Sequence, residues 1–127
     1  MLTRAFVSFD YDHDLVMKGA LLAQSKLSDS PFAIADWSIK EASPTWKSEA
    51  RSRIRHCDVV IVLCGRHTHT ATGVAEELKM AREEGIPYFL LAGYPTGDVT
   101  TPSTALPSDK LYKWTWDNLK NLVGGSR

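Results

Sequence analysis

The stretch Asp58–Cys64, DVVIVLC, decides the fold class of this 127-residue chain. Six apolar residues follow the aspartate without alternation, a pattern typical of a central strand that is covered on both faces. Four of these six residues are β-branched, which favours a strand, and the run is much too short to cross a bilayer. We therefore predict a buried strand here, with helices on both sides of its sheet.

Strand-like and helix-like segments alternate around this run. Further strands are expected at residues 5–9, 32–37, 88–92 and 110–113, and helices after Asp14, from Ser43-Pro44, over 72–84 and over 116–123. Asp14, Ser43 and Thr115 are the expected N-caps of the first, second and last of these helices. Helical spacing predicts that the first helix buries Val16, Ala20, Ala23 and Leu27, the second Trp46, Ala50 and Ile54, and the third Val74, Leu78 and Ala81. This order predicts an α/β, flavodoxin-like, doubly wound parallel sheet of about five strands in the order 2-1-3-4-5, with helices on both faces.

Composition is that of a single domain spanning residues 1–127, with a frayed tail at 124–127. The 15 basic and 15 acidic residues cancel, and no basic stripe stands out, so we expect no nucleic-acid partner. No signal peptide or membrane segment is recognisable, which predicts a cytoplasmic protein. Cys57 and Cys64 flank the central strand roughly 20 Å apart, so two free, buried thiols are expected.

Ligands of doubly wound sheets bind beyond the carboxyl ends of the strands, where the strand order reverses. The loops at 10–14 and 64–72 are expected to meet at that point. Helical geometry puts Glu77 at the edge of the buried stripe of its helix, whereas Glu76 and Glu83 face water. The nearby helix N-terminus favours an ionised carboxylate. From the residues alone, Glu77 is either a functional carboxylate or a simple partner of the helix dipole.

Several phrases of the sequence resemble TIR domains. They are AFVSFDYD at 5–12, ADWS at 35–38, CGRHTHTATGV at 64–74 with the later pair Glu77-Leu78, and YKWTWDNL at 112–119. The closest resemblance is to the bacterial TIR-like family of the Thoeris antiphage defence system, the ThsB-like TIR proteins. It covers almost the whole chain and implies a TIR-like version of the doubly wound fold.

The resemblance also implies an enzyme that consumes NAD⁺, as an NAD⁺ nucleosidase or an ADP-ribosyl cyclase. Glu77 would be its catalytic residue and would stabilise the positive charge that develops on the ribose as nicotinamide leaves. The product would be an ADP-ribose-derived signalling nucleotide, linear or cyclic, that activates an effector protein after phage infection. NAD⁺ is the expected substrate, with no permanently bound cofactor and no metal. A phage-derived trigger and a homo-oligomer stay open.

The substrate contacts expected beside Glu77 come from three segments: Phe9, Asp10 and Tyr11 from the first loop, Asp36, Trp37 and Trp46 from the second strand and helix, and His67, Thr68 and Thr70 from the third loop. Aromatic rings can stack on a base or on nicotinamide, and hydroxyl and imidazole groups can bond to its polar atoms. Trp46 also fits a core position, because it lies on the apolar face of its helix.

Other interpretations of the same residues are weighed beside the enzyme. TIR domains often act as protein-interaction modules without chemistry, and then Glu77 is a helix cap and the loop at 93–108 is a docking surface. The D-x-D-x-D pattern at 10–14 is also typical of aspartyl-phosphate phosphatases, but the chain has no room for a cap domain. A receiver domain needs an aspartate where this chain has Cys64. His67-x-His69 supplies only two zinc ligands, so an exposed loop is favoured.

Overall fold

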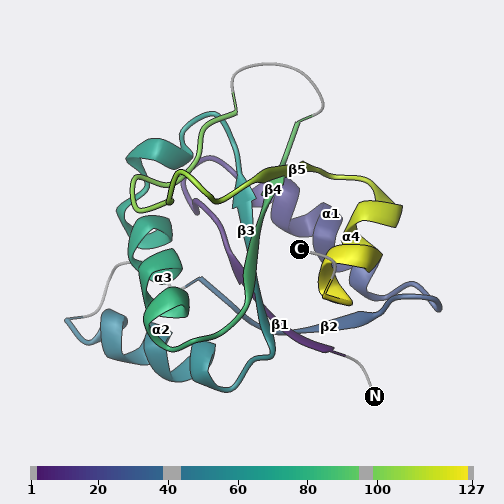
Figure 1. Cartoon of the computed structure of the whole chain (residues 1–127), viewed down its shortest axis with the longest axis horizontal. Coiled ribbons are helices and arrows are strands. Elements are labelled where there is room, and N and C mark those ends of the chain that lie inside the picture. The colour runs from purple at the N-terminus through teal and green to yellow at the C-terminus, as the bar shows by residue number, and fades with distance from the viewer. Residues whose placement is uncertain (1–2, 39–43, 95–98, 126–127) are drawn as a thin grey trace.

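A computed structural model describes residues 3–38, 44–94 and 99–125 and shows a five-stranded parallel sheet between two layers of helices (Figure 1). The strand order is β2-β1-β3-β4-β5, and every neighbouring pair is parallel, which confirms the predicted topology. The elements in chain order are β1 (Thr3–Ser8), α1 (Leu15–Ser25), β2 (Phe32–Trp37), α2 (Trp46–Arg55), β3 (Val59–Cys64), the 3₁₀ turn η1 (Thr68–Thr70), α3 (Thr72–Glu83), β4 (Tyr88–Ala92), β5 (Leu111–Lys113) and α4 (Trp116–Val123).

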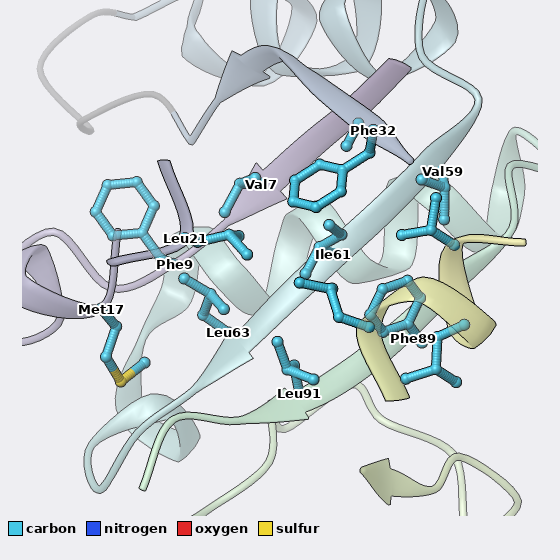
Figure 2. Packing of buried hydrophobic residues seen from close by; sticks show 14 residues of the cluster. Val7, Phe9, Met17, Leu21, Phe32, Val59, Ile61, Leu63, Phe89 and Leu91 are labelled. Carbon is cyan, nitrogen blue, oxygen red and sulfur yellow. The ribbon is translucent and has the colours of Figure 1, made fainter. Parts of the chain in front are cut away.

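The central strand β3 is buried at every position, as its unbroken apolar run predicts. Its side chains alternate between two hydrophobic clusters, one on each face of the sheet. Val59, Ile61 and Leu63 pack against α1 and α4 (Figure 2), whereas the intervening residues pack against α2 and α3. Helices therefore cover both faces of the sheet. Cys57 and Cys64 are free, buried thiols, as expected.

The predicted buried face of α1 is wrong. Val16 is 86% exposed, and Ala20, Ala23 and Leu27 are exposed as well. Met17 and Leu21 are buried in their place. Met17 and Leu21 form a shorter apolar stripe with the same spacing, offset by one residue, so the period alone does not choose between the two stripes. Burying the longer Met17 and Leu21 side chains removes more apolar area from water than burying valine and alanine.

Three helix starts test the predicted capping residues. Thr115 caps α4 as predicted, because its Oγ1 accepts a hydrogen bond from the backbone N–H of Asn118 at 3.1 Å. Asp14 precedes α1, but its carboxylate makes no capping bond. The predicted start of α2 is too early: Pro44 lies in a turn, Thr45 takes the N-cap position, and Ser43 is outside the described residues. A proline fits the turn before a helix as well as its first position.

The carboxyl ends of the strands lead into the loops where a ligand site is predicted. Strand β1 ends at Ser8, so Phe9 and Asp10 already belong to the loop that follows it. Among the described residues, none of the helices is long and apolar enough to cross a membrane.

Candidate functional site

A pocket of about 380 Å³ opens beyond the carboxyl ends of β1 and β2, beside the first turns of α3. Its lining comes from the loop after β1, the residue after β2 and the start of α3: Phe9, Asp10, Tyr11, Asp12, His13, Ser38, Thr70, Ala71, Thr72, Gly73, Val74 and Glu77. The strand order reverses at this edge, since β1 lies between β2 and β3. The pocket therefore lies where the topology predicts a ligand site.

Glu77 forms part of the pocket wall although its side chain is fully buried. The hydroxyl of Ser8 donates a hydrogen bond to Glu77 Oε1 at 2.7 Å, and the hydroxyl of Ser38 donates to the same oxygen at 2.5 Å. Helical geometry alone predicts this carboxylate at the edge of the buried face. The ends of β1 and β2 cover it further and so remove it from bulk water.

Strand geometry explains why these two serines reach α3. Side chains two residues apart in a strand share a face, and Phe6 belongs to the cluster under α2 and α3, so Ser8 points the same way. Ser38 continues the pairing of β2 with β1, because its backbone N–H donates to the carbonyl of Val7 at 2.9 Å. Its Oγ also accepts the N–H of Phe9 at 2.9 Å. Backbone hydrogen bonds thus fix where both hydroxyls lie.

Aromatic side chains form one side of the pocket. The rings of Phe9 and Tyr11 lie 4.4 Å apart, and Trp37 packs edge-on against Phe9 at 6.1 Å. Burial raises the pKa of the Tyr11 phenol, and the nearby negative charge of Glu77 raises it further. Tyr11 therefore keeps its proton at neutral pH and can donate a hydrogen bond inside the pocket.

The loop after β1 gathers several titratable groups. Asp10 Oδ2 bonds to His13 Nδ1 at 2.7 Å, which raises the pKa of that imidazole, and the His13 ring stacks on His67 with centroids 4.1 Å apart. Asp14 is only 2% exposed, and burial together with the charge of Asp10 raises its pKa to about 6. Within the described residues, no group of three or more His, Cys, Asp or Glu side chains is arranged to hold a metal ion.

The structure brings some of the predicted site residues together and leaves others apart. Glu77, Phe9, Asp10, Tyr11 and Thr70 line the pocket. Asp36, Trp37, Trp46, His67 and Thr68 do not belong to its lining.

Each of the residues outside the lining has another partner. Asp36 pairs with Arg53 at 3.0 Å, and Trp46 packs against the hydrophobic cluster under α2 and α3. Thr68 is buried, and its Oγ1 accepts the N–H of Gly65 at 2.7 Å. Trp37 lies behind Phe9, and His67 reaches the site only through its stack on His13.

Sequence reasoning missed Ser8 and Ser38, the two donors to Glu77. Both lie in phrases that carry the family resemblance, at or just after the end of a predicted strand. A polar residue at the carboxyl end of a strand next to the reversal of strand order is the signal that would have indicated them.

Comparison with protein families finds a match over most of the chain. Residues 6–95 match the family model described as Thoeris protein ThsB, TIR-like domain. This range runs from β1 to the loop after β4 and includes every residue of the pocket lining. A search of curated proteins finds no significant match.

Proposed function

The chain belongs to the family of the Thoeris ThsB TIR-like domain, and from this premise we propose that it cleaves the bond between nicotinamide and ribose in NAD⁺. The product would be an ADP-ribose-derived nucleotide, linear or cyclic, that a partner effector protein senses during antiphage defence in the cytoplasm. One observation carries this proposal: a fully buried carboxylate, Glu77, forms part of the wall of the pocket at the reversal of strand order.

In the proposed reaction the bond between ribose C1′ and the nicotinamide nitrogen breaks, and its electron pair leaves with nicotinamide, which becomes neutral. The ribosyl carbon takes on positive charge, as in glycoside hydrolysis, and the carboxylate of Glu77 stabilises it. An oxygen nucleophile then forms a new bond to C1′ and releases its proton to solvent. Water as nucleophile gives ADP-ribose, and a hydroxyl of the same molecule gives a cyclic isomer.

Other features of the pocket support this chemistry. Tyr11 offers an aromatic ring on which nicotinamide or adenine can stack, and Phe9, which is only 2% exposed, packs against that ring. The first turn of α3, at Thr72 and Gly73, also lines the pocket, and the N-terminus of a helix favours an anion such as the diphosphate of NAD⁺. A volume of about 380 Å³ is within the ordinary range of ligand sites.

The test compares two neighbouring glutamates of α3. Glu77→Gln keeps the size of the side chain and removes its charge, so we expect NAD⁺ consumption in phage-infected cells to fall by about 10²-fold or more. Glu76→Gln makes the same change at the next residue, whose side chain is 30% exposed and lies outside the pocket lining, and should keep wild-type turnover. Mass spectrometry of NAD⁺ and ADP-ribose species measures both. Equal turnover in Glu77→Gln and wild type, or none in infected wild-type cells, would count against the proposal.

A second candidate is a protein-interaction module without chemistry. The exposed face of α1 favours it, since Leu15 is 55% and Val16 86% exposed, and Leu27 beyond the helix is 51% exposed. Under this alternative Glu77→Gln would leave partner binding and defence intact.

A further inference from the structure

We propose that Ser8 and Ser38 are positioning residues of this site: their hydroxyls hold the carboxylate of Glu77 in one orientation and keep it ionised. The inference rests on the proposed NAD⁺ cleavage for its catalytic meaning. The two serines contact no reacting atom and act on the reaction through Glu77.

The geometry fixes the direction of both hydrogen bonds. Ser8 is fully buried and Ser38 is 4% exposed, and each hydroxyl has a single hydrogen to donate. The oxygen of Ser38 already accepts the N–H of Phe9, so its hydrogen is left for Glu77 Oε1. Ser8 donates to that same oxygen from the neighbouring strand. Two hydroxyl donors on one oxygen stabilise the ionised form of the carboxyl group, because each hydrogen bond strengthens when that oxygen carries negative charge.

Two opposing effects act on a carboxylate in this position. Burial disfavours its charged form, because the low-dielectric interior solvates charge poorly. Hydrogen bonds donated to the carboxylate favour the charged form, and here two of them converge on one oxygen. A neutral glutamic acid would not stabilise positive charge on the ribose. The two serine hydroxyls thus stabilise the charged form of Glu77, which burial disfavours.

Among the described residues, other ionisable groups near Glu77 come from the loop after β1, from α3 and from α2. From the loop after β1, Tyr11 is close enough for its pKa to respond to the charge of Glu77, and Asp10, Asp12 and His13 share the pocket lining. On α3 itself Glu76 points toward Lys47 of α2, with Oε1 and Nζ 3.9 Å apart.

A titration that needs no substrate tests the proposal. The ¹³C NMR signal of the Glu77 carboxyl, identified by its loss in Glu77→Gln, reports its protonation as the pH is lowered. We expect the midpoint to rise by at least about one pH unit in Ser8→Ala/Ser38→Ala, and by less in each single variant. Ser38→Thr keeps the hydroxyl and should retain the wild-type midpoint.

The matched control is Ser30→Ala. Ser30 is also a buried serine, and its hydroxyl donates to the carbonyl of Phe32 at 2.8 Å, but it lies outside the pocket lining. Its loss should leave the Glu77 midpoint unchanged. An unchanged midpoint in the folded Ser8→Ala/Ser38→Ala protein, or a rise of equal size in Ser30→Ala, would overturn the inference.

Activity provides the second measurement. We expect kcat for NAD⁺ cleavage to fall in the serine variants with little change in KM, and the acidic limb of the pH profile to move in the same direction as the NMR midpoint. Absence of NAD⁺ turnover in the wild-type protein would count against the proposed function alone, since the titration still decides what the serines do to Glu77.

Discussion

Two buried carboxylates lie at the same edge of the sheet and differ in the groups that surround them. Glu77, on α3, receives hydroxyl hydrogen bonds from Ser8 and Ser38. Asp14, before α1, is nearly as buried, and burial together with the negative charge of Asp10 raises its pKa to about 6. Burial and a neighbouring like charge favour the neutral form of a carboxyl group, whereas donated hydrogen bonds such as those at Glu77 favour its charged form.

The largest expected effect on stability comes from removing a donor at Glu77. Ser38→Ala deletes a hydrogen bond to a buried charge and also leaves the N–H of Phe9 without this acceptor. We expect the free energy of unfolding at pH 7 to fall by about 3 kcal/mol. Ser30→Ala removes a serine that both donates to and accepts from the backbone of Phe32, with no charged partner, and should cost about 1 kcal/mol. Urea denaturation of both variants would test this, and equal losses would contradict it.

The next effect acts on the Asp14 side of the comparison. A Cβ atom at Gly65 would lie 2.5 Å from Asp14 Oδ1, so Gly65→Ala forces a buried carboxylate to move. Overpacking of this kind costs about 1–3 kcal/mol. Gly19→Ala is the matched control, because a Cβ at that position of α1 meets nothing within 4 Å, and alanine in a helix interior stabilises by about 0.5–1 kcal/mol. Thermal unfolding that moves both variants in the same direction would rule out the steric explanation.

Some features of the fold and of the site can be predicted from the sequence, and others cannot. The unbroken run of β3 and the alternation of segments predict the strand order, because an apolar run and a helical period are local signals. Glu77 could be singled out because helical geometry relates it to Val74 and Leu78 of its own helix. The two stripes of α1 carry the same period, so only the packed protein shows that Met17 and Leu21 are the buried ones.

The partners of Glu77 and the placing of the aromatic residues depend on how separate strands meet. The register between β1 and β2 shifts by one residue, between the pairs Ala5–Ile34 and Phe6–Asp36. A shift of this kind changes which face the following side chains take. Trp37 accordingly packs against the α1 side with Phe9, and Asp36 reaches Arg53. The sequence contains no signal that predicts this irregularity.

A smaller effect should appear in the pH dependence of stability. The pKa of Asp14 is about 6 in the folded protein, above its ordinary value of 3.8, so the folded state binds this proton more tightly than the unfolded chain. Stability therefore falls as the pH rises from about 4 to about 6, and the cost persists at higher pH. Asp14→Asn removes it, and we expect a gain of about 1–2 kcal/mol at pH 7.5 that shrinks toward pH 4, after discounting a two-unit shift for screening by solvent. If urea denaturation showed a gain in stability that does not depend on pH, the ionisation of Asp14 would not be its cause.

The smallest expected change concerns Asp10, which lines the pocket and also affects the pKa of Asp14. This carboxylate bonds to His13 Nδ1, which is the main cause of the raised pKa of His13, and its charge also contributes to the raised pKa of Asp14. Asp10→Asn should therefore lower the pKa values of both groups at once, because it removes a negative charge that favours the protonated His13 ring and disfavours the ionised Asp14 carboxylate. NMR titration of the His13 ring and of the Asp14 carboxyl measures both. If only His13 responded, burial alone would account for Asp14, and the difference between the two buried carboxylates would rest on hydrogen-bond donors without any contribution from neighbouring charge.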